Sequence, residues 1–326
     1  MLNLVRVHRR AVLKSVRSRG YLGVPFLHTQ QNWLHCPLAV RVKFIYNPAA
    51  GRGRASRHHA EAERHLRALG ADVDAHASSS PADLTRAAAE ASRGDYDRVI
   101  VSGGDGTLHL AVRDFDLAGG TLALVPQGSG DDFAKVLGIP RDLGDACELA
   151  LRGTAREVDV AVANGIRYLG VAGLGFDSEV ARYANDNVKF LRGSLVYLYA
   201  ILRVLPRFTP HRVTIDGTRN EEIMFATVGN SRQYGGGIRI VPEALIDDGR
   251  LNLCVVHRTS RFQLLKTLPQ AYTGAHVKSS FVETGHGTSF TFASERPMDV
   301  YADGERITAT PVEFSLAGQR LRIVAP

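Results

Sequence analysis

The sequence predicts an α/β domain built on a parallel sheet, followed by an all-β, sandwich-like domain. From Arg41 to about Val160, short β-branched runs alternate with segments of helical spacing, and three of the predicted strands end in turns that contain glycine. After Val160 the pattern changes to short alternating runs separated by Gly and Asp turns, which is typical of antiparallel strands. A chain of 326 residues, 44% of them apolar, is also long enough for two cores.

Residues 1–40 form a basic extension before the predicted fold. Eight of the 40 Lys and Arg residues lie in positions 1–43, which hold no acid, while the other 32 are balanced by 33 Asp and Glu. The extension could associate with an anionic membrane surface, act as a transit-type peptide or be disordered. The nearly neutral remainder argues against a nucleic-acid-binding protein.

Residues 41–160 are predicted to form the α/β domain. Its elements, in order, are a strand at 42–46, a helix at 55–69 ended by Gly70, a strand at 73–77, an Ala-rich helix at 82–91, a strand at 99–102, a helix to about 115 and a strand at 121–125. The carboxyl ends of parallel strands lie at one edge of a sheet, where ligands bind. We therefore expect the turns at 47–51, 103–107 and 126–133 to meet there.

Residues 161–326 are predicted to form the β-rich domain, which would bind the substrate. Its clearest strands are expected at 168–173, 211–215, 224–229, 251–256 and 289–292. One apolar helix, at about 191–205, is expected to interrupt them. The uncharged run at 193–201 is too short to span a bilayer, which takes about 20 residues.

Cysteine usage indicates a reducing, cytoplasmic location. The three cysteines, Cys36, Cys147 and Cys254, are odd in number and far apart. Neither a disulfide framework nor a zinc site is therefore expected.

The turn Gly103-Gly104-Asp105-Gly106-Thr107 points to phosphate chemistry. Glycines after a strand let the backbone approach a phosphate, and the helix that follows offers its N-terminal amides. The acid in this turn suggests a cation, or a water network, between Asp105 and the phosphates. The chain has no Gly-Lys dipeptide, which excludes a Walker A loop.

Four motifs occur in an order and spacing that resemble one family. They are Asn-Pro-x-x-Gly at 47–51, Gly-Gly-Asp-Gly-Thr at 103–107, Pro-x-Gly-Ser-Gly-Asp-Asp-Phe-Ala at 126–134, and Gly-Gly-Gly at 235–237 leading to Asp-Asp-Gly at 247–249. From about Arg41 to the C-terminus the chain resembles the diacylglycerol kinase catalytic-domain family, the lipid kinases that include diacylglycerol, sphingosine and ceramide kinases. This resemblance implies an α/β domain like that of NAD kinase and phosphofructokinase.

The resemblance also implies which residues bind ATP and magnesium. The ATP site would comprise Asn47, Pro48, Ala49, Ala50, Gly51, Ser78, Gly103, Gly104, Asp105, Gly106, Thr107, Leu108, His109, Leu110 and Ser129. Asp105, Asp132 and Asp159 would surround the nucleotide-bound Mg²⁺, and Leu245, Asp248 and Arg250 would hold a second, structural Mg²⁺. Without the resemblance, Asp132 reads as a helix N-cap, Asp159 as a solvated strand residue and the Asp-Gly pair at 248–249 as a hairpin turn.

The catalytic acids implied by the resemblance lie in Asp303-Gly304-Glu305. Glu305 would accept the proton of the lipid hydroxyl, and Asp303 would orient it or contact a metal; the two roles could be exchanged. A base must lie within hydrogen-bond reach of that hydroxyl, so this turn must fold over the crevice of the first domain.

Five positions depart from the family pattern. Ser78 and Ser129 stand where threonine is usual, and Ser129 keeps the hydroxyl. His109 and Leu110 stand where an Asn-Glu pair is usual, and Asp131 stands where Asn is usual. We expect the change at 109–110 to remove a polar contact and the change at 131 to place a negative charge beside the nucleotide.

The sequence therefore predicts an ATP- and Mg²⁺-dependent kinase of a diacylglycerol-like lipid, acting in the cytoplasm or at the inner face of the membrane. One alternative is a soluble-metabolite kinase of the NAD kinase type. Another is a nucleotide- or lipid-binding protein with weakened catalysis. The sequence leaves the oligomeric state open, with a homodimer as one possibility.

Overall fold

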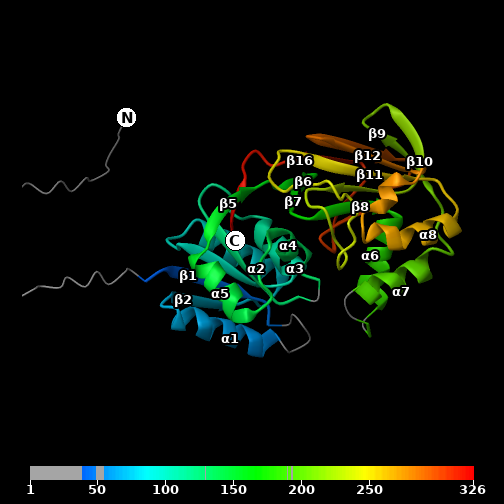
Figure 1. Ribbon diagram of the computed structural model, residues 1–326. Coiled ribbons are helices and arrows are strands. Elements are labelled where there is room, and N and C mark those ends of the chain that lie inside the picture. The colour runs from blue at the N-terminus through cyan, green and yellow to red at the C-terminus, as the bar shows by residue number, and fades with distance from the viewer. Residues whose placement is uncertain (1–38, 49–54, 129, 189, 192–193) are drawn as a thin grey trace, which may run out of the picture. The chain divides into compact units, whose positions relative to one another are not determined.

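The structure is a computed structural model that describes residues 39–48, 55–128, 130–188, 190–191 and 194–326. Apart from its last two residues, the predicted basic extension lies outside these ranges. The described residues form two sheets with helices packed on them (Figure 1).

The first sheet has six strands in the order β2-β1-β3-β4-β17-β5. Five run parallel, and β5 pairs antiparallel with β17. The strands are β1 (Arg41–Tyr46), β2 (Asp72–Ala77), β3 (Arg98–Gly103), β4 (Thr121–Pro126), β5 (Thr154–Val158) and β17 (Leu321–Ala325). All six positions of β4 are buried, as expected for a strand covered on both faces.

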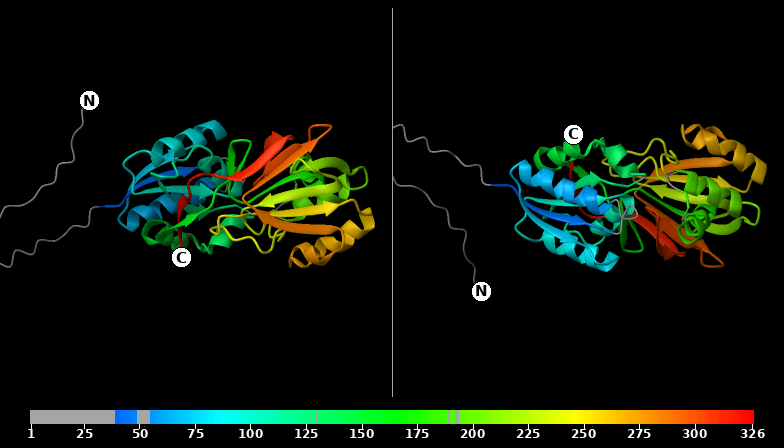
Figure 2. Two further views of the ribbon diagram at one scale, coloured as in Figure 1. Left: turned by 90° about the horizontal axis from the view of Figure 1, so that it is seen from above. Right: turned by 90° about the horizontal axis from the view of Figure 1, so that it is seen from below.

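Helices cover both faces of the first sheet (Figure 2). They are α1 (Ala55–Ala68), α2 (Pro81–Ser92), α3 (Asp105–Val112), α4 (Asp132–Leu137) and α5 (Leu143–Arg152). Local sequence fixes where two of them begin: Ser80 caps α2 by accepting a hydrogen bond from Asp83 N–H, and Asp142 caps α5 through Asp145 N–H.

The second sheet has eleven antiparallel strands. They are β6 (Ala161–Ala163), β7 (Ile166–Tyr168), β8 (Val171–Gly175), β9 (His211–Ile215), β10 (Arg219–Gly229), β11 (Leu251–His257), β12 (Val282–Gly287), β13 (Ser289–Ser294), β14 (Asp299–Ala302), β15 (Glu305–Ala309) and β16 (Val312–Leu316). Three helices, α6 (Phe176–Asn187), α7 (Ser194–Val204) and α8 (Arg261–Ala271), share a core with this sheet, and a short 3-10 helix, η2, spans Ala275–Lys278.

The predicted fold class is confirmed, with two differences in detail. The strand predicted at 168–173 is two strands, β7 and β8, because the amides of Leu169 and Gly170 between them donate to a side chain instead of a ladder. The predicted second domain, 161–326, also includes β17, which the structure adds to the first sheet. Within the described ranges, no helix is both long enough and apolar enough to cross a membrane.

Candidate active site

The turns after β3 and β4 and the end of β1 lie at one edge of the first sheet because these strands are parallel neighbours, and of the turn predicted at 47–51 only Asn47 and Pro48 lie within the described residues. The two turns that follow β3 and β4 touch through glycine. A Cβ atom on Gly104 would lie 3.0 Å from the Cα of Gly128, and one on Gly128 would lie 2.8 Å from the Cα of Gly104. Side chains at either position would therefore push the two turns apart.

Asp105 joins these turns by capping a helix that is distant in the sequence. Its two carboxylate oxygens accept hydrogen bonds from the first amides of α4, at 3.0 Å from Asp132 N and 3.1 Å from Phe133 N. Burial raises the pKa of Asp105 to about 6, and the nearby carboxylates of Asp132 and Asp303 act in the same direction. The acid in the phosphate-type turn thus has a structural role that the sequence did not reveal.

Asp132 connects the first domain to the glycine-rich loop at 235–237. Its Oδ2 accepts a hydrogen bond from Gly236 N at 2.6 Å, while Oδ1 accepts from Lys135 Nζ at 3.1 Å and Gln233 Nε2 at 3.4 Å. Gly235, Gly236 and Gly237 all have positive φ, a run of backbone that other residues would strain. The triple glycine therefore lets this loop present an amide to Asp132.

Asp303 is held by three donors. Leu169 N and Gly170 N donate to its carboxylate at 3.1 and 2.9 Å, and Nδ1 of His109 lies 3.3 Å from Oδ2. A carboxylate accepts only, so Nδ1 carries the proton of this contact. Asp303 and Gly304 have φ of 52° and 90°, and they form the two-residue turn between β14 and β15 that the Asp-Gly pair predicts.

Glu305 lies over the N-terminus of α3. It follows the Asp303-Gly304 turn, its side chain is exposed, and its Oε1 lies 3.7 Å from the position that a Cβ on Gly106 would occupy. The predicted catalytic turn therefore does fold over the glycine-rich edge of the first domain. Because both oxygens of Asp303 already accept hydrogen bonds, the geometry favours Glu305 as the free base.

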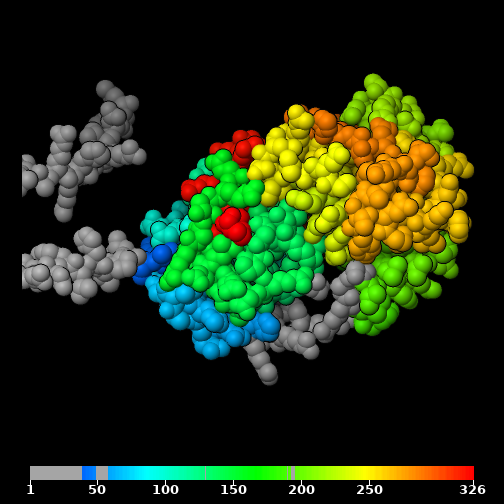
Figure 3. Space-filling model, in the orientation of Figure 1, coloured from blue at the N-terminus to red at the C-terminus, as the bar shows by residue number. Residues whose placement is uncertain are grey.

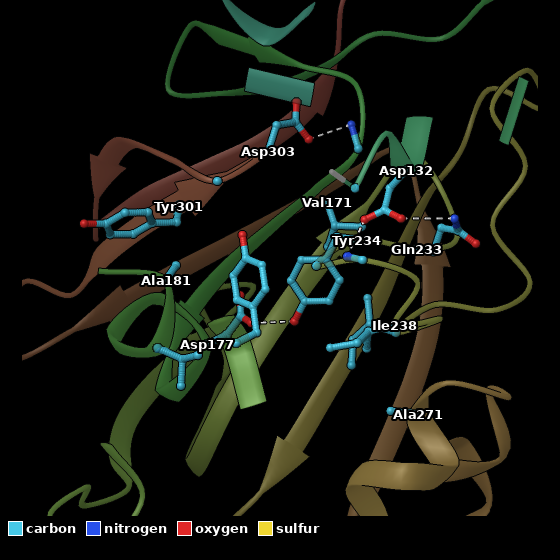
Figure 4. Close-up of a pocket in the computed structure, with 18 of the residues that line it drawn as sticks. Asp132, Val171, Asp177, Ala181, Gln233, Tyr234, Ile238, Ala271, Tyr301 and Asp303 are labelled. Carbon is cyan, nitrogen blue, oxygen red and sulfur yellow. Dashed lines mark hydrogen bonds between the residues drawn. The ribbon is translucent and has the colours of Figure 1, made fainter. Parts of the chain in front are cut away.

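These residues line one cavity of about 410 Å³ (Figure 4). At one end are glycines of the turns after β3 and β4 with Asp105, Asp132, Asp303 and Glu305; the rest is mainly apolar side chains from α6, α7, α8 and the second sheet. The Tyr234 hydroxyl donates to Asp177 within this apolar part, and burial raises the pKa of Asp177 to about 6. The cavity thus joins a polar, glycine-rich end to an apolar chamber.

Several residues of the predicted ATP site lie at the sheet edge without lining the cavity. Asn47 accepts a hydrogen bond from His59 Nε2 at its carbonyl, Pro48 is exposed, and Ser78 Oγ donates to Tyr46 O at 3.1 Å, which ties the end of β2 to β1. Ala49, Ala50, Gly51 and Ser129 lie outside the described residues.

The segment 103–110 divides between the cavity and the core. Gly104, Asp105, Gly106 and Leu108 line the cavity. The other four do not: a Cβ on Gly103 would lie 2.3 Å from Thr107 Oγ1, His109 contacts Asp303, and Leu110 packs against the core of the first domain. A nucleotide contact through the Leu110 side chain therefore receives no support from its position.

The conformation of Asp131 shows why an aspartate can replace the usual asparagine at this position. It has φ of 49°, in the left-handed region that Asn and Asp tolerate best after Gly, and its Oδ1 accepts a hydrogen bond from Gly128 N at 2.9 Å. Burial raises the pKa of this carboxyl above its usual range. Asp131 therefore fulfils the backbone role of an asparagine but adds an acidic group.

The structure places Asp159 with the predicted second metal turn rather than with Asp105 and Asp132. Its Oδ2 accepts a hydrogen bond from Gly249 N at 2.7 Å, and its Oδ1 accepts one from Arg320 Nε at 2.8 Å. In the same turn Asp248 Oδ1 accepts a hydrogen bond from Arg250 N at 3.0 Å, and Leu245 is about half exposed. The Arg320 guanidinium thus already supplies a cation beside Asp159.

The acids at the cavity fit a hydrated magnesium ion. Among the described residues, no group of three His, Cys, Asp or Glu side chains converges as a ready-made metal cage. The oxygens of Asp105 and Asp132 accept protein hydrogen bonds, yet a carboxylate has about four acceptor sites, which leaves room for the water shell of an ion. Magnesium keeps several waters and is commonly held through one or two carboxylates and substrate phosphates.

Sequence reasoning missed the polar residues of the apolar chamber. Tyr197 lines the cavity, and burial raises the pKa of its hydroxyl to about 12. Asp177 and Tyr234 were not singled out. The Gly235-Gly236-Gly237 motif next to Tyr234 was the available signal, because three successive glycines indicate a specialised backbone.

Comparison with known proteins assigns both domains to known families. Residues 41–163 match the model of the diacylglycerol kinase catalytic domain, and residues 170–325 match the YegS C-terminal NAD kinase beta sandwich-like domain. A diacylglycerol kinase of Mycobacterium tuberculosis is 32% identical over 297 residues, which cover 88% of this chain and 95% of that protein; one of Bacillus subtilis is 28% identical over 292 residues, covering 88% and 96%.

One solved structure is similar to this chain over nearly the whole length of the solved protein. It is a diacylglycerol kinase from Bacillus anthracis str. Sterne, with a TM-score of 0.72 and 26% sequence identity, covering 88% of this chain and 97% of that one. The matches span both domains and all four motifs, and kinases of this family phosphorylate an alcohol group. The chain belongs to the diacylglycerol kinase family.

Proposed function

We propose that this protein uses ATP and Mg²⁺ to phosphorylate the hydroxyl group of a diacylglycerol-like lipid. The observation that supports this most directly is the composition of the cavity. Glycine-rich turns and Glu305 lie at one end of it, and apolar side chains of α7 and α8 line the other. A phosphate donor and an apolar acceptor would therefore meet beside a free carboxylate.

The polar end would bind the nucleotide. The α3 N-terminus and the glycine turns after β3 and β4 would offer backbone amides to phosphate oxygens, and β1, which ends just before Asn47, lies next to β3 in the sheet. Asp105 and Asp132 would hold the hydrated ion, and Mg²⁺ supplies neutralisation of the charge on the β- and γ-phosphates. We keep Leu245, Asp248 and Arg250 as candidate ligands of a second, structural ion, with Asp159 supporting their turn through Gly249.

Glu305 would act as the base. It accepts the proton of the lipid hydroxyl as the hydroxyl oxygen bonds to the γ-phosphorus, while the bond from that phosphorus to the bridging oxygen breaks and ADP leaves. Asp303 would position Glu305, because its own oxygens are occupied by Leu169 N, Gly170 N and His109. The acceptor would come from a membrane surface, where lipids of this class reside.

Phosphate transfer to lipids in mixed micelles tests this proposal. ATP labelled at the γ-phosphate is supplied with diacylglycerol, phosphatidylglycerol, sphingoid and isoprenoid acceptors in turn. Glu305→Gln should abolish turnover and leave the fold intact, whereas Glu295→Gln, which changes an exposed glutamate elsewhere in the second domain, should not affect it.

Two results would overturn the proposal. Phosphorylation of NAD or another soluble metabolite, with no transfer to any lipid, would favour the soluble-metabolite kinase. Binding of ATP and Mg²⁺ without phosphorylation of any component of a broad lipid extract would favour a binding protein. Light scattering after size exclusion determines the oligomeric state, for which a homodimer is one possibility.

A further inference from the structure

Exposed apolar side chains concentrate on two helices of the second domain. Among the described residues, seven of the eight large hydrophobic side chains that are exposed belong to α7, α8 or the residues beside them. We use the term apolar helix face for the five on the helices themselves: Leu195, Leu198, Leu202, Phe262 and Leu265. Phe262 is 76% exposed and Leu195 56%, so these side chains lack a protein partner within the described part of the chain.

On each helix the exposed residues form a stripe beside the residues that line the cavity. On α7 the exposed leucines are spaced three and four residues apart, while Tyr197 and Ile201 line the cavity. On α8 Phe262 and Leu265 are exposed, while Leu264 and Leu268 line it. At about 100° per residue, each stripe lies roughly a quarter turn from the cavity side of its helix.

The apolar helix face and the wall of the cavity share one residue. Leu265 lines the cavity and is also 37% exposed, so it belongs to both. Residues of α7 and α8 share one core with α6, and Figure 3 shows the orange surface of α8 meeting the green surface of α6 and α7. The apolar helix face therefore lies next to the wall of the chamber on these two helices.

The sequence around both helices contains no acids. Residues 187–215 and 249–282 are the two longest acid-free stretches after residues 1–60, and together they hold ten Lys and Arg residues. Arg203 on α7 and Lys266 on α8 are exposed, and neither forms an ion pair with a described carboxylate. Apolar side chains bordered by basic ones, without acids, are typical of segments that lie in the interface of an anionic bilayer.

We infer that the apolar helix face docks the protein on a bilayer that contains anionic lipid. Docking would bring the two helices that line the chamber to the membrane, where the acceptor lipid resides. The lack of acids in residues 187–215 and 249–282 and the exposed Arg203 and Lys266 favour a lipid surface over a protein partner or a second copy of the chain. The inference rests on the proposed lipid kinase activity, because it takes the chamber to be the site of the acceptor lipid. Docking itself can be measured without turnover.

Vesicle binding of the full chain tests the inference. The probe is co-sedimentation with vesicles of phosphatidylcholine alone and of phosphatidylcholine and phosphatidylglycerol in equal amounts. The test variant is Leu198→Glu with Phe262→Glu, which replaces two exposed apolar side chains. The control is Ala60→Glu with Ala68→Glu, which adds the same charge at exposed positions of α1 in the first domain.

We expect the test variant to bind the mixed vesicles at least tenfold more weakly than the wild type and the control to bind within about twofold of it. Thermal unfolding should be unchanged in both variants, because the four substituted side chains are exposed. Phosphorylation of a short-chain, water-soluble diacylglycerol should also be unchanged in the test variant, while phosphorylation of the long-chain lipid in vesicles should fall with binding.

Three outcomes would overturn the inference. The first is equal vesicle binding by the test variant and the wild type. The second is an equal loss in test and control variants, which would assign binding to overall charge. The third is a dimer that the test variant converts to a monomer without a change in vesicle binding, which would make this face a contact between copies. Failure of the proposed function is distinct, because it would abolish turnover on both lipids while vesicle binding persists.

Discussion

The contact between His109 and Asp303 links two residues 194 positions apart, and it predicts that His109 positions the catalytic turn. In His109→Asn the amide nitrogen takes the place of Nδ1, two bonds from Cβ, so a donor to Asp303 is kept. In His109→Gln the donor moves one bond further along the side chain, and in His109→Leu it is lost. The three variants therefore distinguish the effect of the hydrogen-bond donor from the effect of side-chain volume.

The expected size of the effect follows from the geometry. A hydrogen bond to a charged group contributes about 1.5–3 kcal/mol, and at 3.3 Å this one is longer than most, so the lower end applies. Asp303 would still accept from the amides of Leu169 and Gly170, so the turn would loosen without collapsing. A loss of about 1.5 kcal/mol in the transition state lowers kcat by roughly tenfold.

Steady-state kinetics in mixed micelles, together with thermal unfolding, distinguishes positioning from other roles. We expect kcat to fall about tenfold in His109→Gln and His109→Leu and to stay within about twofold of wild type in His109→Asn, with KM for ATP unchanged throughout. A rise in KM for ATP without a fall in kcat would instead show that His109 contacts the nucleotide. Equal kcat in all three variants, or losses that follow only the melting temperature, would refute the positioning role.

Three further predictions concern other residues near the cavity. Asp131→Asn keeps a residue suited to the left-handed backbone and removes a charge near the proposed phosphate site, so KM for ATP should fall about 2- to 5-fold at unchanged kcat in steady-state assays. Gly170→Ala would place a Cβ 2.3 Å from Asp303 Oδ1, so kcat should fall at least tenfold, whereas Gly285→Ala, with nothing within 4 Å, should be silent. The pKa of Asp177, about 6 against an ordinary 3.8, means that its contribution to stability is complete below 3.8 and is lost as the pH rises through 6. Asp177→Asn should therefore reduce the fall in free energy of unfolding between pH 5 and pH 8 by about 1 kcal/mol, measured by urea unfolding of the ligand-free protein.

Local patterns in the sequence predicted most of the first domain. Strands β1, β3 and β4 and the turns after them depend on β-branched runs and glycines that are adjacent in the chain. The Asp303-Gly304 turn was also predicted from two residues that are adjacent in the chain. The helix α8 was missed although its start carries a Ser260 and Gln263 capping box, because the surrounding pattern of short strands suggested continued β structure.

The site was predictable only where the family pattern covered it. The motifs placed Asp105, Asp303 and Glu305 near one another, but not the capping of α4 by Asp105 or the contact of His109 with Asp303, which depend on how two domains pack. The position of Asp159 beside Arg320 likewise depends on residues 161 positions apart. Such pairings leave no periodicity in the sequence that could reveal them.

The return of β17 to the first sheet has a consequence for biosynthesis. Leu321, Ile323 and Val324 are buried between β4 and β5, so the core of the first domain lacks part of its apolar content until residues 321–325 are available. Until β17 has been synthesised, the edge of β4 that faces away from β3 has no strand to pair with. The first sheet is therefore completed only after the strands of the second have been synthesised, and removal of residues 321–325 would disturb the sheet that carries the proposed ATP site.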